Sequence, residues 1–351
     1  MNVAKRLDHE SIMNGQTSGP IAAATRWALA AASVAYRGGV TIRNRRYDRG
    51  RDVHRVDVPV LCVGNLTTGG TGKTPVVAEI ARRLRSKNVR VAIVSRGYGR
   101  GESGTNDEAK ELYDRLPDVP HVQDADRVAA ATIAVDELES QFVVMDDGFG
   151  HRRLHRDANV VLIDATNPFG FDHLLPRGLL REPLSSLARA DLVILTRTDQ
   201  ADGPTLSKIE QRIAEHFAGP ILRSTHAPTG WRTDRGDVQP IDTLQNQTVA
   251  LVSAIGNPAA FERTAEPLVG GIGQHFKLPD HAAIDAATMT RLQRWAADQT
   301  ADAIVCTHKD LVKLRIDRLG GRPLYALQID LALDDPDAHL SALIDRLIPA
   351  D

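Results

Sequence analysis

Residues 63–75, VGNLTTGGTGKTP, decide the fold of this chain. They follow an apolar, β-branched run and precede an amphipathic stretch, so a glycine-rich turn joins a strand to a helix. Glycines let backbone N–H groups turn towards phosphate oxygens, and the helix N-terminus adds the positive end of its dipole. Lys73 is then expected to reach the β- and γ-phosphates of a nucleotide, and the Thr74 hydroxyl to bind Mg²⁺. Thr67 stands where the strict G-x-x-x-x-G-K-[ST] pattern has glycine.

The whole turn is expected to cradle the phosphates of a nucleotide. Its residues are Thr67, Thr68, Gly69, Gly70, Thr71, Gly72, Lys73 and Thr74. The alternative is a glycine-rich strand-to-helix turn that binds no ligand.

Apolar strands alternate with helical stretches from residue 58 onward. We expect strands at 58–64, 89–95, 141–147, 159–164, 191–196 and 220–225, with helices at 73–87, 125–139 and 204–217. Continuous apolar strands separated by amphipathic helices indicate a parallel sheet covered on both faces. After a polar stretch the alternation resumes, with strands at 248–256, 272–276, 301–308 and 322–330 and helices at 258–267, 285–298 and 336–347. The expected fold class is α/β: a P-loop NTPase-like parallel-sheet domain with a second, smaller α/β domain.

The expected organisation has five parts. They are a polar N-terminal extension at 1–19, a helix and basic segment at 20–56, a P-loop domain at 57–225, a linker at 226–245 and a smaller α/β domain at 246–351.

Composition excludes several classes of protein. The 351 residues include 43 Lys+Arg and 45 Asp+Glu, and 42% are apolar, which is ordinary for a globular chain and argues against a globally basic nucleic-acid binder. No nucleic-acid partner is expected. Cys62 and Cys306 are far apart and lie in apolar runs, so we expect buried free thiols and neither a disulfide scaffold nor a cysteine zinc site.

The N-terminal segment combines a weakly apolar helix with a basic cluster. Residues 20–36 are rich in alanine but contain Arg26, and no stretch reaches the 18 to 20 apolar residues that span a membrane. Arginines dominate residues 37–55. Such a segment can lie on an anionic leaflet. A docking helix with a solvated basic loop is the alternative.

Two further segments carry charged groups suited to phosphoryl transfer. The strand at 141–147 ends in Asp146, where a P-loop protein places an acid beside magnesium, and residues 148–157 (GFGHRRLHRD) follow it directly. In residues 174–184 (LLPRGLLREPL), Arg181 can stabilise a transferring phosphoryl group and Glu182 can help to hold the metal.

The order of these motifs resembles that of the tetraacyldisaccharide 4′-kinases, the lipid A 4′-kinases of bacteria with an outer membrane. The resemblance runs from about residue 25 to about residue 330. It rests on VGNLTTGGTGKTP, SRGYGR (95–100), DDGF-x-HRRLHRD (146–157), LLPRGLLREPL, AIGNP (254–258) and THKD (307–310). Gly150 departs from the family's DDGFQH run, and Ala282 replaces the second histidine of a family Asp-His-His segment.

The resemblance implies a reaction and its site. ATP would phosphorylate the 4′-hydroxyl of a tetraacylated, 1-phosphorylated glucosamine disaccharide, a step of lipid A biosynthesis, and the enzyme would be peripheral on the cytoplasmic face of the inner membrane. Asp107 and His281 would activate the sugar hydroxyl, and Lys73 and Arg181 would neutralise the transferring group. The metal ligands for Mg²⁺ would be Thr74, Asp146 and Glu182. The substrate-binding residues would be Asn65, Arg96, Asp147, His151 and Arg152.

Two other functions stay open from the sequence. THKD follows a strand and loosely matches the guanine-reading motif of GTPases, which favours a P-loop GTPase or ATPase switch or a metallochaperone-like protein. A non-catalytic, membrane-associated descendant of the kinase is the other alternative.

Overall fold

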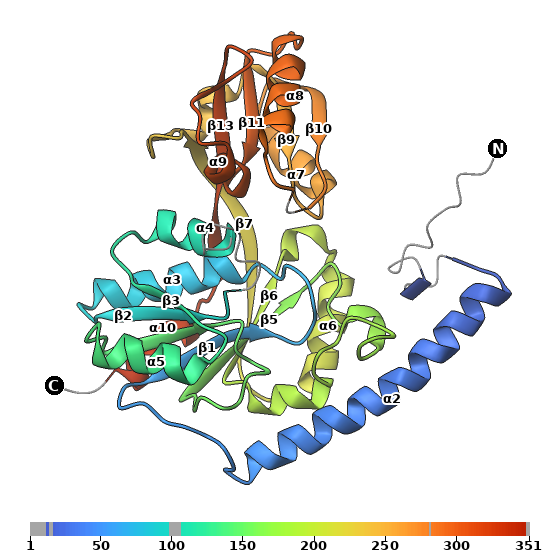
Figure 1. Cartoon of the computed structure of the whole chain (residues 1–351), viewed down its shortest axis with the longest axis vertical. Helices are drawn as coiled ribbons and strands as arrows, with labels where there is room; N and C mark the ends of the chain where they lie inside the picture. Colours follow the sequence, from blue (N-terminus) through green and yellow to red (C-terminus); the bar gives the residue numbers. More distant parts are fainter. Residues whose placement is uncertain (1–11, 14–16, 98–106, 281, 349–351) are drawn as a thin grey trace. The chain divides into compact units, whose positions relative to one another are not determined.

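The chain forms two compact units (Figure 1). The computed structural model describes residues 12–13, 17–97, 107–280 and 282–348. Unit 1 comprises Met1–Tyr98, Leu116–Thr225 and Ala332–Asp351, and unit 2 comprises Gly99–Arg115 and His226–Leu331. Strands β7 (Ile221–Arg232) and β13 (Arg322–Asp334) each contain residues of both units. Residues 226–232, expected in a linker, are therefore part of a strand.

Unit 1 contains the parallel sheet expected from the sequence. Its strand order is β7-β6-β5-β1-β4-β2-β3, and each neighbouring pair is parallel. The strands are β1 (Val60–Asn65), β2 (Val91–Ser95), β3 (His121–Gln123), β4 (Phe142–Asp146), β5 (Ala158–Asp164) and β6 (Leu192–Thr196). Since β1 lies between β4 and β5, the glycine-rich turn leaves the middle of the sheet. The parallel-sheet prediction is confirmed.

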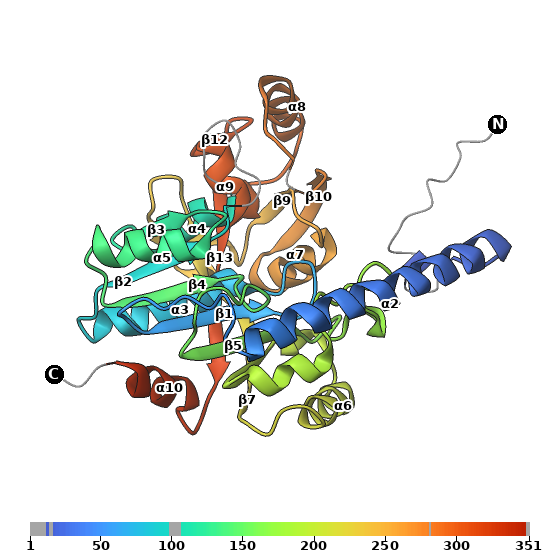
Figure 2. The same ribbon diagram turned by 60° about the horizontal axis from the view of Figure 1, so that its bottom comes forward.

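Helices complete unit 1. They are α2 (Pro20–Asp48), α3 (Lys73–Ser86), α5 (Arg127–Asp136), α6 (Gly203–Ala214) and α10 (His339–Leu347), with 3-10 turns η1 (Gly170–Asp172), η2 (Leu184–Arg189) and η3 (Thr198–Gln200). Helix α2 is one continuous rod (Figure 2) that extends into the arginine cluster. Helix α10 returns to α3: Lys87 Nζ lies 2.8 Å from Asp345 Oδ1, and Arg83 donates to Ser341 Oγ at 2.8 Å. Residues expected in the second domain thus complete the first unit.

Unit 2 has a smaller sheet in the order β10-β9-β11-β13, also parallel. Its elements are β9 (Thr248–Ser253), β10 (Gly271–Lys277), β11 (Ala303–Thr307), α7 (Pro258–Ala265), α8 (Ala286–Ala297), α9 (His308–Leu314), η4 (Ile241–Leu244) and η5 (Glu266–Leu268). Short strands β8 (Val238–Gln239) and β12 (Arg318–Leu319) pair antiparallel with β7 and β13. In β9, Leu251 packs in a cluster with Phe261 of α7, and Val252 packs in another with Leu292 of α8. Both faces of β9 are therefore buried, as is typical of a continuous apolar strand in a parallel sheet.

Helix α4 (Asp107–Arg115) belongs to unit 2 although it lies between β2 and β3 of unit 1 in the sequence. His308 Nε2 and Asp114 Oδ2 are 2.5 Å apart, and Arg232 Nη2 lies 3.1 Å from the same oxygen. Arg115 donates to Asp330 Oδ1 and to the Ile329 carbonyl, each at 3.0 Å. These charged contacts, which the local sequence does not reveal, hold α4 on α9 and β13.

Two simpler expectations are also tested by the structure. Cys62 and Cys306 are buried free thiols, as expected, and burial raises the pKa of Cys62 to about 11. Within the described ranges, the helices are too short or too polar to cross a bilayer.

Candidate active site

The glycine-rich turn joins β1 to α3 in the way that phosphate binding requires. Gly69 and Gly72 have positive φ angles of 108° and 78°, and α3 begins immediately afterwards at Lys73. Gly64 is needed for a different reason, because a Cβ there would lie 2.7 Å from the Phe149 Cβ. The turn therefore ends at a helix N-terminus, where the backbone N–H groups lack intrahelical partners and favour an anion.

Backbone hydrogen bonds bring residues 179–181 against the start of this turn. Thr68 N donates to the Leu179 carbonyl at 2.8 Å, and Arg181 N donates to the Leu66 carbonyl at 2.7 Å. From β6, Thr196 Oγ1 donates to the Thr71 carbonyl at 3.0 Å. Two motifs more than 100 residues apart in the sequence thus form one structure, and Arg181 is positioned by its own backbone.

Four predicted site residues meet beside this turn. Arg181 binds Asp147 with two hydrogen bonds, Nη2 to Oδ1 at 2.7 Å and Nη1 to Oδ2 at 3.1 Å, and Nη2 also donates to Asn65 Oδ1. Lys73 Nζ lies 3.6 Å from Asp147 Oδ1. Asp147 therefore holds two cations at the start of α3. We refer to Asn65, Lys73, Asp147 and Arg181 as the loop cluster.

The electrostatics of the loop cluster favour ionised Asp147. Burial raises the pKa of this carboxyl, but the hydrogen bond from Arg181 and the charge of Lys73 outweigh burial, and the net pKa is lowered. Arg181 behaves reciprocally: burial lowers its pKa, and Asp147 raises it by more. One carboxylate thus faces two cations, which leaves positive charge for phosphate oxygens.

Thr74 and Asp146 have the chemistry that a magnesium site needs. Thr74 lies in the first turn of α3, and Asp146 ends β4, paired in register with Val63 of β1. Hydroxyl and carboxylate oxygens are hard donors of the kind that Mg²⁺ prefers. The described residues contain no group of three or more His, Cys, Asp or Glu side chains that could hold a metal. Mg²⁺ in phosphoryl-transfer sites is usually bound by one or two protein ligands together with phosphate and water.

Glu182 is engaged elsewhere. Its carboxylate is 1% exposed; Oε1 binds Arg43 of α2, while Oε2 accepts from Asn44 of α2 at 2.7 Å, from Ser186 at 2.9 Å and from Arg189 at 3.3 Å. Both carboxylate oxygens therefore accept hydrogen bonds from other residues of unit 1, and Glu182 connects the Arg181 segment to α2.

The loop after Asp147 is fixed by its own arginines. Arg156 Nη1 donates to the carbonyls of Gly148, Phe149 and His151 at 2.9–3.4 Å. Arg152 faces α2, where it donates to the Asn44 carbonyl at 3.0 Å and to Asp48 Oδ1 at 2.7 Å. Burial lowers the pKa of His151 to about 4, so its ring is neutral near pH 7. The expected substrate roles of His151 and Arg152 stay predictions.

Arg127 was not predicted, although it is 3% exposed at the start of α5. Its Nε has no hydrogen-bond partner among the described residues. Burial and Arg96 lower the pKa of Arg127, while Asp147 and Asp146 raise it, so its charge acts on the strand-end acids. The available signal was an arginine directly after a capping aspartate, and that pattern is too common at helix starts to single it out.

The structure describes the remaining predicted site residues only in part. Asp107 is the first residue of α4, but its side chain lies outside the described part of the chain, as does all of His281. Arg96 follows the end of β2 and is exposed.

The THKD segment caps a helix. Thr307 is the N-cap of α9, and buried Asp310 accepts from Thr307 Oγ1 at 2.6 Å and from Ala254 N at 3.2 Å. A guanine-reading carboxylate has to reach a base, whereas Asp310 is used inside unit 2.

A strand, a glycine-rich turn and a helix that begins Lys-Thr, beside a strand-end aspartate in a parallel sheet, define a P-loop protein that handles nucleoside triphosphates. The family model described as Tetraacyldisaccharide-1-P 4'-kinase matches residues 25–348. The chain belongs to this family.

Individual relatives agree over almost the full length. The tetraacyldisaccharide 4'-kinase of Geobacter sulfurreducens is 34% identical over an alignment of 360 positions, which covers 96% of this chain and 98% of that protein. That of Anaeromyxobacter dehalogenans is 35% identical over 344 residues, covering 92% and 91%. The crystal structure of LpxK from Aquifex aeolicus in complex with ATP matches with a TM-score of 0.76 at 29% identity, covering 93% of this chain and all of that one.

Proposed function

We propose that this chain transfers the γ-phosphoryl group of ATP to the 4′-hydroxyl of a tetraacylated, 1-phosphorylated glucosamine disaccharide. The observation that carries the proposal is the loop cluster, in which Asp147 holds Lys73 and Arg181 at the start of α3. Phosphoryl transfer needs positioning and compensation of negative charge more than covalent chemistry. Two cations fixed at a helix N-terminus supply both.

The residues of unit 1 have distinct roles at the nucleotide. The backbone of residues 67–74 binds the phosphates, Lys73 contacts the β- and γ-phosphates, and Arg181 faces the group in transfer. Thr74 and Asp146 would hold Mg²⁺, which would neutralise negative charge on the phosphates. We assign Glu182 to positioning Arg181, because its oxygens bind α2 and η2.

The acceptor hydroxyl needs a base, for which we propose Asp107 assisted by His281. The hydroxyl proton passes to Asp107 as the O4′–P bond forms and the bond from the γ-phosphorus to the bridging oxygen breaks, releasing ADP. Arg96 and His151 are the proposed contacts to the acceptor. The support is the family relationship together with the position of Asp107 at the first turn of α4.

The outer face of α2 supports a peripheral position on the cytoplasmic face of the inner membrane. Trp27, Val34 and Ile42 recur at helical spacing and are 72–80% exposed. The opposite face carries buried Val40 and contacts the rest of unit 1, where Tyr36 donates to the Arg181 carbonyl at 3.1 Å. An apolar outer face followed by arginines is typical of helices that lie in a membrane interface.

Vesicle sedimentation tests this position. Replacing Trp27, Val34 and Ile42 by glutamate should weaken binding to lipid vesicles about 100-fold or more, since fully burying each apolar side chain contributes about 1.5–3 kcal/mol. Leu138→Glu, at an exposed leucine elsewhere in unit 1, is the control. Equal binding by the triple variant and the wild type would refute the position.

A lipid phosphorylation assay tests the reaction. The protein is given γ-labelled ATP or GTP and a tetraacyl disaccharide 1-phosphate in detergent micelles. We expect labelled bisphosphorylated lipid with ATP, and a loss of about 100-fold or more in Lys73→Met. Stronger binding of GTP than ATP would favour a switch protein. Nucleotide binding without labelled lipid would favour a non-catalytic descendant.

A further inference from the structure

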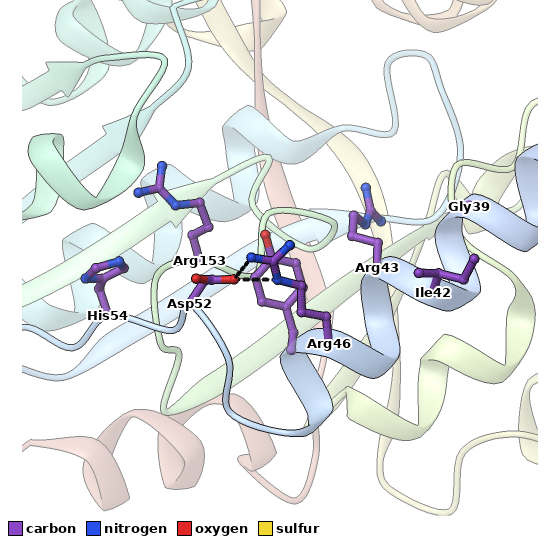
Figure 3. A pocket seen from close by; sticks show the side chains of 8 residues that line it. Gly39, Ile42, Arg43, Arg46, Asp52, His54 and Arg153 are labelled. Atoms are coloured by element: carbon purple, nitrogen blue, oxygen red, sulfur yellow. Dashed lines mark hydrogen bonds and ion pairs between the residues drawn. The ribbon is translucent and has the colours of Figure 1, made fainter.

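A hollow of about 440 Å³ lies beside the C-terminal half of α2 (Figure 3). Helix α2 contributes Ile42, Arg43 and Arg46, the chain just after the helix contributes Asp52 and His54, and Arg153 comes from the loop after β4. Figure 3 shows Arg46 reaching Asp52, with His54 and Arg153 on the far side of this pair. None of the loop cluster residues lines the hollow, so it is separate from the proposed phosphoryl-transfer site.

The backbone on one side of this hollow is fixed. His54 N donates to the Arg153 carbonyl, and His155 N donates to the His54 carbonyl, both at 2.7 Å. His54 and Leu154 form a parallel bridge, and the Leu154 side chain is buried. His54 and Arg153 are thus held side by side by the backbone, as in a preformed site.

The charge of the hollow suits an anion. Three arginines line it, against one aspartate. Arg46 binds Asp52, Arg43 binds Glu182, and Arg153 Nη1 lies 3.1 Å from Asp126 Oδ2. Each carboxylate occupies only part of a guanidinium, which carries five N–H donors. The remaining donors match a phosphate group, which guanidinium binds in a planar, two-pronged geometry.

The rim of the hollow connects this basic site to the proposed membrane face. Ile42 lines the hollow and also belongs to the exposed apolar face of α2. A helix lying in a membrane interface buries its apolar face roughly 5–10 Å, which brings its flanks to the level of the headgroups. A lipid could therefore place its phosphate on the arginines while its glycerol and first methylenes contact Ile42.

We propose that this hollow binds the phosphodiester headgroup of an anionic membrane phospholipid, separately from the acceptor. The inference rests on the proposed membrane position. A free phosphate ion would meet the same guanidinium groups but gain nothing from Ile42, so the lipid is the favoured occupant. The bound headgroup would fix the C-terminal half of α2 on the leaflet.

Vesicle binding separates a specific site from diffuse attraction. The full chain is mixed with phosphatidylcholine vesicles containing none or a third phosphatidylglycerol. The test variant is Arg46→Ala with Arg153→Ala, and the control is Arg45→Ala with Arg49→Ala, which removes the same charge near the same helix end but outside the hollow. We expect the control to bind the anionic vesicles roughly 30-fold more weakly than the wild type, because it loses two charges near the surface, and the test variant to bind about 10-fold more weakly than the control. Equal losses in both variants would overturn the proposal.

Two further arms identify the source of the phosphate. Inorganic phosphate at millimolar concentration, with ionic strength held constant, should displace the protein from anionic vesicles less than twofold. The KM for the disaccharide acceptor in neutral micelles should be unchanged in the test variant. A tenfold higher KM with unchanged vesicle binding would assign the hollow to the acceptor phosphate and overturn the proposal. If the wild type lacked kinase activity but kept its arginine-dependent vesicle binding, the proposed function alone would fail.

Discussion

Glu182→Gln distinguishes a positioning residue from a metal ligand. The substitution keeps the size of the side chain but removes a negative charge that faces Arg43 and Arg189, and it places an amide where Asn44 and Ser186 donate. The Arg43 side chain is 42% exposed, so solvent screening limits that pair to at most about 1 kcal/mol. The Arg189 side chain is only 20% exposed, and a hydrogen bond to a charged group there contributes about 1.5–3 kcal/mol.

The free energy of unfolding should therefore fall by about 3 kcal/mol. At roughly 2–4 °C per kcal/mol for a unit of this size, the melting temperature should drop by roughly 6–12 °C. Thermal unfolding followed by circular dichroism measures the change. Glu79→Gln is the matched control, because Glu79 pairs with Arg82 and Arg83 on the surface of α3. Such pairs contribute about 0.3–0.5 kcal/mol each, so the melting temperature of the control should fall by only about 1–4 °C.

A magnesium titration of kinase activity completes the test of Glu182. If Glu182 is a positioning residue, Glu182→Gln should lower kcat and should leave the Mg²⁺ concentration that gives half-maximal activity within about twofold of the wild-type value. The reasoning would be refuted if Glu182→Gln melted within 2 °C of the wild type and needed tenfold more Mg²⁺.

Four further predictions concern the site and its surroundings. Arg181→Lys loses the two-pronged contact with Asp147, so kcat should fall about 10²-fold while the affinity for ATP changes little; unchanged steady-state kcat would contradict this. Burial lowers the pKa of His121 to about 4, below its ordinary value near 6.5, so the unfolded chain gains a proton first as pH falls between these values. The free energy of unfolding should drop in this range by up to about 1.4 kcal/mol per pH unit. In His121→Gln, the free energy of unfolding measured with urea should depend less steeply on pH, by the amount that corresponds to one proton. A Cβ at Gly150 would lie 3.6 Å from its nearest neighbour, so Gly150→Gln should melt within about 2 °C of the wild type, and a larger loss would show that glycine is required. His308→Ala removes a contact of α4, so amide exchange should accelerate in α4 and not in β9; uniform acceleration would instead indicate general unfolding of unit 2.

The local features of the site could be predicted from the sequence because each is encoded by adjacent residues. The turn and α3 follow from a strand, a run of glycines and Lys-Thr, and Asp146 follows from its place at the end of an apolar strand. The parallel order of unit 1 follows from buried strands alternating with helices. These inferences need no knowledge of distant contacts.

The contacts of Glu182 and the membership of α4 could not be predicted in the same way. Glu182 and Arg43 are 139 positions apart, so the sequence does not reveal their contact. Because Glu182 directly follows Arg181, the sequence instead suggested an active-site role for both of these neighbours. The partners of Asp114, which hold α4 on unit 2, lie more than 100 residues downstream. Helix α2 reaches Asp48 because arginine is a good helix former, although the apolar pattern ends near residue 36.

The most direct test of the central claim is a stoichiometric turnover with γ-labelled ATP. One equivalent of labelled ATP is mixed with excess protein and acceptor, and ADP, free phosphate and labelled lipid are counted together. The account predicts one labelled lipid for each ADP formed, with the label on O4′ by NMR. ADP accompanied by free phosphate and unlabelled lipid would contradict it.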